Sequence, residues 1–342
     1  MRLLVTGGCG FIGSNFIINE INKYDNNICN IDSLTYASNK SNLENIDKNK
    51  YEFHKCDILS KNKLKEIFFS FKPHAVIHFA AESHVDRSID SPLDFVNTNV
   101  LGTVNLLRIS QDYLDSNNSH DNFKFLHVST DEVYGSLGDD GLFSELTSYD
   151  PSSPYSASKA SADHFVNAWY KTYDFPAIIS NCSNNYGPFQ FPEKLIPLII
   201  SNCLNEKKLP VYGNGENVRD WLYVTDHCEA LHSLYLYGEI GQSYNIGGNH
   251  EMKNIDIVKQ ICELMDEFKP RSNGEKYKNL IHFVSDRPGH DYRYAIDASK
   301  ILNEVSWEAQ ETFQSGIKKT VKWYLQNREW LSAMELKNKS SS

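Results

Sequence analysis

A glycine-rich turn near the N-terminus restricts the folds open to this chain more than any other segment. The turn, Thr6-Gly-Gly-Cys-Gly-Phe-Ile-Gly13, follows the apolar run Leu3-Leu-Val5 and opens an apolar segment over 11–23. This order predicts a strand, a tight turn and a helix, which is the start of a parallel βαβ unit. Gly7 would permit the turn, Gly10 would let backbone N–H groups approach a pyrophosphate, and Gly13 would allow close packing of helix on strand.

Short apolar strands alternate with helical segments through the first half of the chain. Strands are expected at 28–32, 51–54, 75–79, 123–128 and 177–180, and helices at 60–71, 93–115 and 154–173. Such alternation requires a parallel sheet with right-handed crossovers. The sequence therefore predicts an α/β fold with a Rossmann-type doubly wound sheet over residues 1–184.

The regular alternation fades from about residue 185. Short strands are expected at 210–212, 222–224 and 243–246, and helices at 254–268 and 312–335. These elements predict a smaller mixed α/β lobe over 185–335. The polar segment 336–342 is expected to be a disordered tail.

Composition excludes several classes of protein. A formal net charge of −10 argues against a non-specific nucleic-acid binder, which would carry a basic surface. No run reaches the roughly 18 apolar residues of a membrane span. The seven cysteines are scattered without a CxxC motif, and a strand pattern starts directly after Met1, so no signal peptide is expected. We therefore expect a cytoplasmic protein with reduced thiols.

The glycine turn and the strand ends that follow it predict NAD as the cofactor. Asp32 ends the second strand, where a carboxylate would bond the ribose hydroxyls of adenosine. No arginine follows Asp32 directly to accept the 2′-phosphate of NADP. Asp57 would bond the adenine amino group while Ile58 packs on the ring. The predicted cofactor contacts are Gly7, Gly10, Phe11, Ile12, Gly13, Asp32, Asp57, Ile58, Ala80, Ala81, Ser83, Asn99, Tyr155 and Lys159.

Two further groups of residues carry acid–base chemistry. Tyr155 and Lys159 are four residues apart on the helix that Pro154 opens, so they share one face. A nearby ammonium lowers the pKa of a tyrosine, which makes Tyr155 a base for a hydroxyl group. Thr130 ends the preceding strand and can hydrogen-bond the reacting oxygen.

The adjacent acids Asp131 and Glu132 are the discriminating pair. Different environments can keep one carboxyl protonated as an acid and the other ionised as a base. A plain dehydrogenase needs no such pair beside Tyr155 and Lys159. Together these residues indicate oxidation, elimination of water and re-reduction in one pocket.

Several segments resemble one enzyme family across nearly the whole chain. They are TGGCGFIGS (6–14), HFAAESHVDRSI (78–89), STDEVYG (129–135), YSASK (155–159), NCSNNYGPFQFPEKLIP (181–197), YGNGENVRDWLYVTDH (212–227) and DRPGHDYRYAID (286–297). In these segments the chain is similar to the dTDP-glucose 4,6-dehydratases of the extended short-chain dehydrogenase/reductase superfamily.

The resemblance implies a mechanism and a product. Tyr155, with Lys159 and Thr130, would take the proton of the carbon-4 hydroxyl while hydride passes to NAD. Glu132 would then remove the carbon-5 proton, and Asp131 would protonate the carbon-6 hydroxyl, which leaves as water. Hydride returning to carbon 6 would give dTDP-4-keto-6-deoxy-glucose, an intermediate for deoxysugars such as dTDP-rhamnose, with NAD tightly bound and recycled.

The resemblance also implies the substrate contacts and the assembly. Asn185 and Arg219 would contact the diphosphate, and Pro210 and Tyr212 would sandwich thymine. A homodimer through the helices near 93–115 and 155–172 is expected, and no metal. The full set of implied substrate contacts is Glu82, Ser83, Thr130, Asn184, Asn185, Glu193, Lys194, Leu195, Pro210, Tyr212, Arg219, Asn254, Arg287 and His290.

Other readings stay open at this point. A nucleotide-sugar 4-epimerase would need Tyr155 and Lys159 but not Asp131 and Glu132. A dehydratase acting on a UDP-sugar would use the same residues, since uracil and thymine offer the same stacking face. A catalytically silent NAD-binding protein would keep the glycine turn and lose the catalytic residues, all of which are present.

Overall fold

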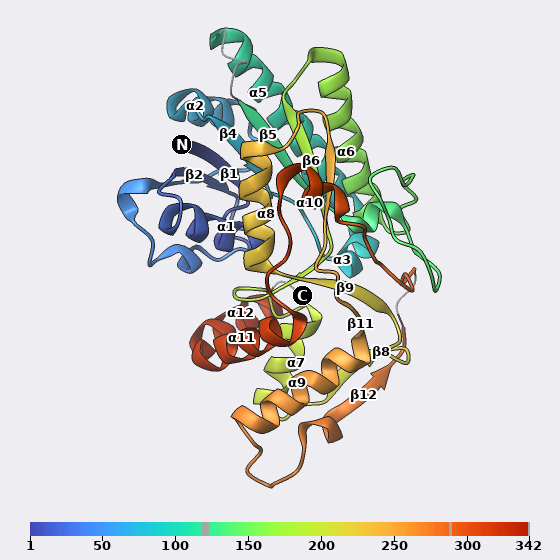
Figure 1. Cartoon of the computed structure of the whole chain (residues 1–342). Coiled ribbons are helices and arrows are strands. Elements are labelled where there is room, and N and C mark those ends of the chain that lie inside the picture. The colour runs from blue at the N-terminus through green and yellow to red at the C-terminus, as the bar shows by residue number, and fades with distance from the viewer. Residues whose placement is uncertain (118–122, 287–288, 341–342) are drawn as a thin grey trace.

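The computed structural model describes residues 1–117, 123–286 and 289–340, and its centre is a seven-stranded sheet (Figure 1). The strand order is β10-β6-β5-β4-β1-β2-β3, and every neighbouring pair is parallel. The bounds are β1 Arg2–Thr6, β2 Asn27–Asp32, β3 Tyr51–Lys55, β4 Ala75–His78, β5 Lys124–Thr130, β6 Ala177–Cys182 and β10 Ser243–Ile246. This arrangement confirms the predicted Rossmann-type fold class.

Helices cover both faces of the sheet, because successive strand residues point to opposite sides. In β1, Leu3 and Val5 join one core with residues of α1 and α8, whereas Leu4 joins a second core with residues of α2, α5 and α6. The bounds are α1 Phe11–Asn22, α2 Lys61–Phe71, α5 Thr103–Asn117, α6 Pro154–Tyr173, α8 Val224–Tyr237 and α10 Ser299–Val305. Both faces of the sheet are therefore buried.

The helix expected at 93–115 is divided into several pieces. The helices α3 (Val85–Asp90) and α4 (Pro92–Phe95) lead into a π-helical segment, Val96–Gly102, before α5. A side chain at Gly102 would collide with Ile58, since a Cβ there would lie 2.4 Å from Ile58 Cδ1. π-Helical turns like those of Val96–Gly102 are rare in proteins, and those that occur are often at functional sites.

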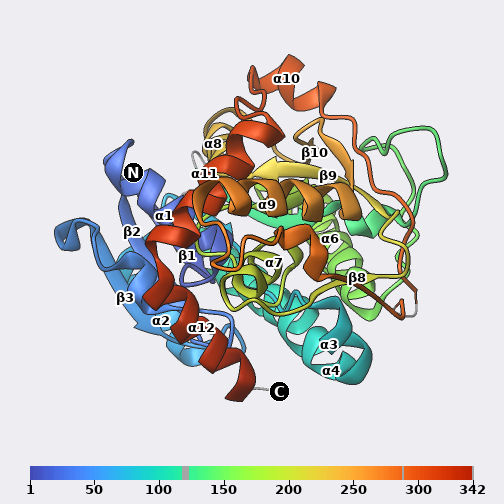
Figure 2. The same ribbon diagram turned by 90° about the horizontal axis from the view of Figure 1, so that it is seen from below.

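A smaller lobe lies below the sheet in Figure 1. Its helices α7, α9 and α11 lie side by side around an apolar core that includes Ile200, Ile261 and Ile317 (Figure 2). It contains the sheet β11-β9-β7 and the parallel pair β12-β8. The bounds are β7 Asn184–Tyr186, α7 Leu195–Leu204, β8 Leu209–Tyr212, β9 Val218–Tyr223, β11 Glu251–Lys253, α9 Asn254–Phe268, β12 Ile281–Val284 and α11 Phe313–Gln326. Short 3₁₀ helices occur at Lys40–Leu43, Lys48–Lys50, Asp131–Tyr134 and Tyr277–Leu280.

The structure differs from the predicted boundary at residue 184 and from the predicted tail. β10 and α8 follow that boundary in sequence, yet β10 pairs with β6 and α8 packs on α1. The last helix, expected at 312–335, is two helices, because α11 ends at Gln326 and α12 covers Arg328–Ser340. Residues 336–340 are thus helical and not disordered, and Lys337 Nζ donates to the carbonyl of Ser38. Residues 341–342 lie outside the described part of the chain.

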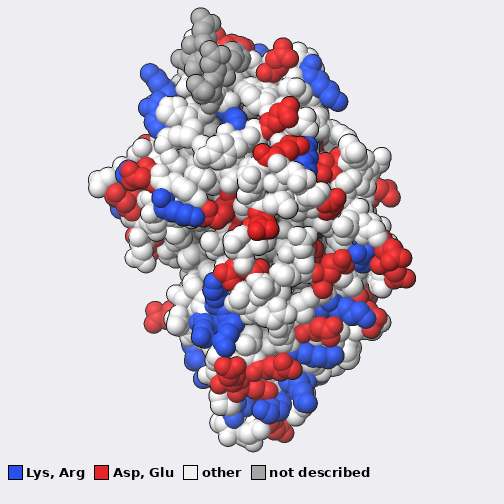
Figure 3. Space-filling view, viewed as in Figure 1, with Lys and Arg blue, Asp and Glu red and all other residues white. Residues whose placement is uncertain are grey.

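Surface and thiol features accord with an ordinary globular chain. On the face drawn in Figure 3, described acidic and basic side chains are interspersed. All seven cysteines are free and buried. In the described residues, no helix is both long and apolar enough to cross a membrane.

Candidate active site

A cleft with a volume of about 330 Å³ lies at the carboxyl ends of the sheet strands. Parallel α/β sheets place ligands at this edge. The glycine turn after β1, Asp32 at the end of β2, and residues 79–83 after β4 line one part. Residues 128–132 at the end of β5 and residues 182–185 around β7 line the rest. One cleft therefore joins the predicted cofactor contacts to the predicted catalytic residues.

The glycine turn has the shape that a dinucleotide needs. Gly7 has a φ of +73°, and its N–H donates to the Ile31 carbonyl at 2.8 Å. A Cβ on Gly7 would lie 2.7 Å from the backbone nitrogen of Ala80, and one on Gly13 would lie 2.5 Å from the Gly7 carbonyl oxygen. The backbone is therefore as close as glycine alone permits, and the N-terminus of α1 faces the cleft, which suits the pyrophosphate of NAD.

Asp32 borders the turn and holds it in place. Its carboxylate accepts hydrogen bonds from the backbone N–H of Cys9 at 2.9 Å and of Leu34 at 2.8 Å. Burial raises the pKa of Asp32, and these two hydrogen bonds oppose that rise. The carboxylate still lines the cleft and retains acceptor sites for ribose hydroxyls.

Of the predicted cofactor contacts, Asn99 alone lies outside the cleft lining. It is 1% exposed and sits in the π-helical segment. Its side chain accepts from the Glu82 N–H at 2.8 Å and donates to the Glu82 carbonyl at 3.0 Å and to Ser158 Oγ at 2.8 Å. Asn99 therefore fixes the segment that passes the cofactor site, and its predicted direct contact stays a prediction.

Replacing Gly13 by alanine is expected to release the cofactor. The added Cβ would meet backbone atoms of Gly7 and Gly8, which cannot move aside as a flexible side chain can. We expect the purified Gly13→Ala protein to retain less than about a tenth of the wild-type NAD, which corresponds to roughly 1.4 kcal/mol of binding free energy. The measurement is NAD per chain after desalting. Gly138→Ala is the control, because a Cβ there meets open space; full NAD retention by Gly13→Ala would contradict the assignment.

The predicted catalytic residues converge at the end of β5. Thr130, Glu132, Tyr155 and Lys159 line the cleft, whereas Asp131 lies just beneath it at 1% exposure. The chain leaves the strand as a 3₁₀ helix, so Asp131 and Glu132 do not alternate as strand residues would. The Thr130 side-chain hydroxyl accepts from the Glu132 N–H at 3.3 Å and donates to Asp131 Oδ1 at 3.3 Å.

The two acids of the pair occupy different environments. Burial raises the pKa of Asp131 well above its ordinary value, and the neighbouring negative charges of Glu132 and Asp220 raise it further. Asp131 Oδ2 is buried and accepts no hydrogen bond from the residues that the structure describes. Asp131 is thus suited to hold a proton, while Glu132 is exposed to the cleft. This division agrees with the predicted roles of acid and base.

Tyr155 and Lys159 lie on one face of α6, as predicted. A capping box of Ser153 and Ser156 fixes the start of this helix, with Pro154 in its first turn. Lys159 is 4% exposed and donates to the Val128 carbonyl at 2.9 Å. The expected lowering of the Tyr155 pKa is wrong for this structure: burial raises that pKa well above its ordinary value, and the charge of Glu132 adds to the rise.

Half of the predicted substrate contacts line the cleft, and the segment 190–194 closes one side of it. Lys194 Nζ donates to the Ser83 carbonyl at 2.9 Å, and the Tyr36 hydroxyl donates to Glu193 Oε1 at 3.0 Å. Arg87 lies over the Tyr36 ring at 3.6 Å. The predicted contacts that the structure brings into the lining are Glu82, Ser83, Thr130, Asn184, Asn185, Glu193 and Lys194.

The remaining predicted substrate contacts lie outside the lining. Arg219 is 5% exposed, and its guanidinium donates to the carbonyls of Val218 at 2.7 Å and Asp291 at 2.9 Å. Tyr212 and His290 meet edge to face at a ring separation of 6.2 Å on the smaller lobe. Arg287 lies outside the described residues. The full set that does not line the cleft is Leu195, Pro210, Tyr212, Arg219, Asn254 and His290.

Sequence reasoning missed several residues of the site. Cys182 and Ser183 line the cleft where β6 ends, a position that the strand-end rule could have indicated. His127 and Asp163 are buried next to Lys159 and form a pair at 3.2 Å. Asp163 follows Lys159 by one helical turn, so the four-residue spacing was the available signal.

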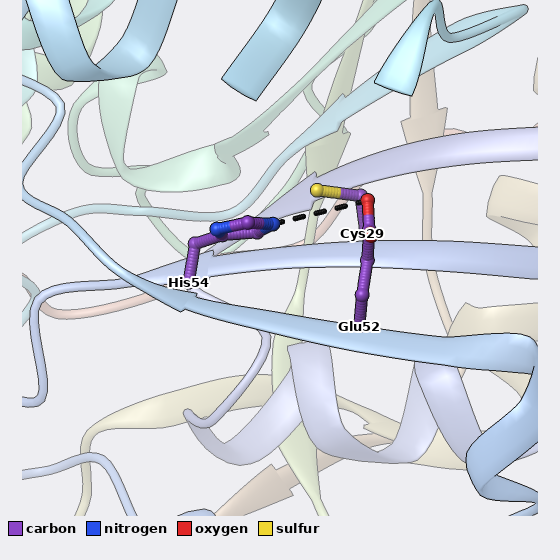
Figure 4. Close-up of side chains that lie close together, drawn as sticks. All are labelled: Cys29, Glu52 and His54. Atoms are coloured by element: carbon purple, nitrogen blue, oxygen red, sulfur yellow. Dashed lines mark ion pairs between the residues drawn. The ribbon is translucent and has the colours of Figure 1, made fainter. Parts of the chain in front are cut away.

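A cluster of possible metal ligands lies elsewhere, on β2 and β3. Ligand atoms of Cys29, Glu52 and His54 lie within 4.8 Å of one another (Figure 4). Burial raises the pKa of the Cys29 thiol far above its ordinary value, and Glu52 adds to the rise. His54 Nε2 pairs with Glu52 Oε1 at 3.8 Å. A cysteine binds a metal as the thiolate, and the raised pKa of Cys29 disfavours that form, so we assign no metal to this cluster.

Comparison with known proteins places this site in a family. A family model described as GDP-mannose 4,6 dehydratase matches residues 4–320. A probable dTDP-glucose 4,6-dehydratase of Sinorhizobium fredii is 55% identical over 96% of this chain and 94% of that protein. The dTDP-glucose 4,6-dehydratase of Salmonella typhimurium is 51% identical over 97% of this chain and 95% of its own length.

Solved structures agree with the sequence relatives. The dTDP-glucose 4,6-dehydratase of Bacillus anthracis, in complex with NAD, has a TM-score of 0.87 and 46% identity over 98% of this chain and 99% of that one. The enzyme of Streptomyces venezuelae, solved with NAD and dTDP, has a TM-score of 0.89 and 40% identity over 98% of this chain and 100% of that one. A UDP-glucose 4-epimerase of Thermus thermophilus has a TM-score of 0.84 but 26% identity, over 96% of this chain and all of that one. The chain therefore belongs to the GDP-mannose 4,6-dehydratase family of the short-chain dehydrogenase/reductase superfamily and, within it, to the dTDP-glucose 4,6-dehydratases.

Proposed function

We propose that this protein converts dTDP-glucose to dTDP-4-keto-6-deoxy-glucose and water, with NAD recycled in each turnover. The observation that carries the proposal is the pairing of a buried Asp131 with a cleft-lining Glu132 beside Tyr155 and Lys159. An epimerase has no use for two carboxyl groups in such different environments at this place. The glycine turn in the same cleft supplies the cofactor site.

Three residues act together in the first proton transfer, at the carbon-4 hydroxyl of the sugar. Tyr155 accepts the proton of the carbon-4 hydroxyl, Thr130 hydrogen-bonds the same oxygen, and Lys159 favours the phenolate that Tyr155 becomes. NAD, when bound, supplies the hydride acceptor and donor and a positive ring that also favours this phenolate. The ketone at carbon 4 makes the carbon-5 hydrogen acidic, which allows a carboxylate to act as its base.

Elimination needs an acid and a base on neighbouring carbons. Glu132 takes the carbon-5 proton, and Asp131 gives its proton to the carbon-6 hydroxyl, which leaves as water. The raised pKa of Asp131 favours its protonated form, which is the form that can donate this proton. Hydride returns to carbon 6 and a proton returns to carbon 5, so the product has lost one water and the cofactor ends in its oxidised form.

The sugar nucleotide is proposed to extend from the cleft toward the smaller lobe. Glu82, Asn185 and Lys194 would meet the sugar and diphosphate within the lining. Tyr212 is 45% exposed and would be available to stack on the thymine ring. The proposed product is an intermediate for deoxysugars such as dTDP-rhamnose.

The reaction is tested with purified protein, dTDP-glucose and no added cofactor, in deuterated water. We expect the sugar nucleotide to lose one water and to gain one deuterium at carbon 5, as read by mass spectrometry and NMR. Epimerisation would leave the mass and carbon 5 unchanged, and turnover of UDP-glucose alone would reassign the nucleotide. No reaction even after NAD is added would contradict the proposal.

A homodimer is proposed through the helices that flank the cleft. Several large apolar side chains are exposed there: Leu93 is 73% exposed, Val96 and Leu101 are each 47% exposed, and Phe165 on α6 is 40% exposed. The π-helical segment and α4 both pack on α6, so these residues belong to one side of the molecule. Contiguous exposed apolar surface marks protein–protein contacts.

Replacing Leu93 and Phe165 together by glutamate is expected to give a monomer. Two buried charges at an interface cost several kcal/mol, so the dimer would weaken by roughly 100-fold or more. Sedimentation of both proteins at matched concentrations measures the effect. Leu146→Glu is the control, because Leu146 is 95% exposed on the loop that precedes α6, outside the helices proposed to form the interface. A wild-type protein that sediments as a monomer would contradict the assembly.

The cytoplasm is the proposed location. Seven reduced, buried cysteines and the absence of a described disulfide support it.

A further inference from the structure

A buried polar cluster lies behind Lys159, on the side away from the cleft. Its central residue is Asp163, which is 0% exposed and lies one turn after Lys159 on α6. Asp163 Oδ2 accepts hydrogen bonds from Ser129 Oγ at 2.9 Å, from the Tyr149 hydroxyl at 3.0 Å and from Asn181 Nδ2 at 3.3 Å. Three donors on one oxygen suit an ionised carboxylate, which is acceptor-only.

The other oxygen of Asp163 lies next to His127. Oδ1 is buried and accepts no hydrogen bond from the described residues, and it lies 3.2 Å from His127 Nε2. The same His127 nitrogen lies 3.5 Å from Lys159 Nζ. One ring nitrogen of His127 is therefore close to both the buried Lys159 amine and the buried Asp163 carboxyl group.

The other groups around Lys159 carry no opposing charge. Burial and, after it, the Lys159 charge lower the pKa of His127 to about 4. Burial also lowers the pKa of His78 on β4, so both imidazoles are neutral near pH 7. Burial raises the pKa of the Cys182 thiol on β6 to about 12. Tyr155 on α6 holds its proton, because burial and Glu132 raise its pKa.

An isolated buried ammonium is costly, and a nearby buried anion compensates it. Burial lowers the pKa of Lys159, and the charge of Asp163 is the largest influence that raises it. Asp131 is poorly suited to this purpose, since burial and the negative charges of Glu132 and Asp220 raise its pKa well above the ordinary value. Glu132 faces the reacting sugar and changes charge during the proposed reaction.

We propose that Asp163 is the fixed counter-charge that keeps Lys159 an ammonium through the reaction, with neutral His127 next to both groups. Asp163 is in this view a positioning residue that never touches substrate. The inference rests on the proposed function, because it concerns the step in which Tyr155 takes the carbon-4 proton. Loss of the charge would let Lys159 lose its proton at lower pH, and Tyr155 would then lose the cation that favours its phenolate.

The test isolates the first step of the reaction. In an Asp131→Asn, Glu132→Gln background the reaction stops after oxidation, and bound reduced cofactor is read by absorbance. The rate of cofactor reduction is measured as a function of pH in this background, with and without the additional Asp163→Asn substitution. We expect the alkaline limb of the profile to move to lower pH by roughly one unit or more, the usual effect of removing an adjacent opposite charge. Tyr149→Phe is the matched control, because it removes one hydrogen bond to Asp163 and leaves the charge.

A second readout needs no turnover. Lysine labelled with ¹³C at Cε reports the protonation of Lys159, whose signal is assigned with Lys159→Met. We expect its titration midpoint to fall in Asp163→Asn and to stay in Tyr149→Phe. An unmoved midpoint and an unmoved limb in Asp163→Asn, with an active wild type, would overturn the inference alone. A wild type inactive on dTDP-glucose would instead overturn the proposed function.

A third variant covers failure of Asp163→Asn to fold. Ser129→Ala with Tyr149→Phe removes two of the hydrogen bonds to Asp163 and keeps its charge. If the charge is what matters, the alkaline limb stays within about a third of a unit of its wild-type position, well below the shift that loss of a charge produces. If Asp163 serves only to pack the cluster, the alkaline limb moves when these hydrogen bonds are lost, which would overturn the inference.

Discussion

The Asp131→Asn, Glu132→Gln variant is expected to oxidise dTDP-glucose at carbon 4 but to release almost no water. Asparagine has no proton to give to the carbon-6 hydroxyl, and glutamine is too weak a base for the carbon-5 hydrogen. General acid–base catalysis contributes roughly 10²–10⁴-fold per group, so product formation should fall by at least about 10⁴-fold for the pair. Tyr155 and Lys159 are untouched, so substrate should still reduce the bound cofactor. Stopped-flow absorbance and mass spectrometry of the sugar nucleotide separate the two steps.

The Asp131→Asn variant alone tests the direction in which the rate of elimination changes with pH. Because burial and negative neighbours raise the pKa of Asp131, it keeps its proton to higher pH than an ordinary aspartate does and loses it as pH rises through the raised pKa. Wild-type elimination should therefore weaken on the alkaline side, and Asp131→Asn should be slow at every pH without this dependence. Asp131→Asn and Glu132→Gln should each keep a wild-type melting temperature, since neither amide is larger than the carboxyl group that it replaces. Water loss by the double variant at the wild-type rate would show that the acid–base assignment is wrong.

Tyr155→Phe is expected to abolish both steps. The phenol oxygen is the group that takes the carbon-4 proton, and phenylalanine has no atom to replace it. We expect the rate of cofactor reduction by substrate to fall by roughly 10²–10⁴-fold, with no accumulation of reduced cofactor and no water loss. This pattern is opposite to that of the acid pair, in which oxidation survives. Single-turnover absorbance with dTDP-glucose is the measurement.

Tyr134→Phe is the matched control for that variant. Tyr134 is 3% exposed on the same 3₁₀ helix as Asp131 and Glu132, and its hydroxyl donates to Asn245 Oδ1 at 2.9 Å outside the cleft. Its loss costs about 1 kcal/mol of stability and leaves the chemistry in place. Tyr155→Phe should in addition retain its NAD, because the glycine turn is unchanged. Rapid cofactor reduction by Tyr155→Phe would remove Tyr155 from its assigned role.

Much of this site was predictable because its parts are local in sequence. The glycine turn, the strand before it and the helix after it are consecutive, and α9 begins and ends where its residues predict, at Asn254 and Phe268. Tyr155 and Lys159 share a face because one helix carries both. The carboxyl-end rule then brings the turn, Thr130 and Glu132 to one edge of the sheet, since all the strands are parallel.

The rest depends on neighbours that are distant in sequence. Arg219 was expected at the diphosphate, yet carbonyl groups of the 291–292 segment engage its guanidinium. β10 joins the main sheet from beyond the predicted boundary, where it pairs in parallel with β6, a strand about 60 residues earlier in the chain. The pKa of Tyr155 rises where the sequence predicted a fall, because burial of the phenol outweighs the ammonium one turn away.

By itself, the sequence determined the class of sheet and the glycine turn, and it named the candidate acid–base residues, because each is encoded by spacing within a short segment. Only the tertiary structure decided that Asp131 is the buried one of two adjacent acids. It also decided which groups Asn99 and Arg219 hydrogen-bond, and that the Asp163 carboxylate lies near Lys159. The physical reason is that desolvation and charge compensation are set by atoms that the fold brings together from separate strands and helices, and no local pattern records their distances.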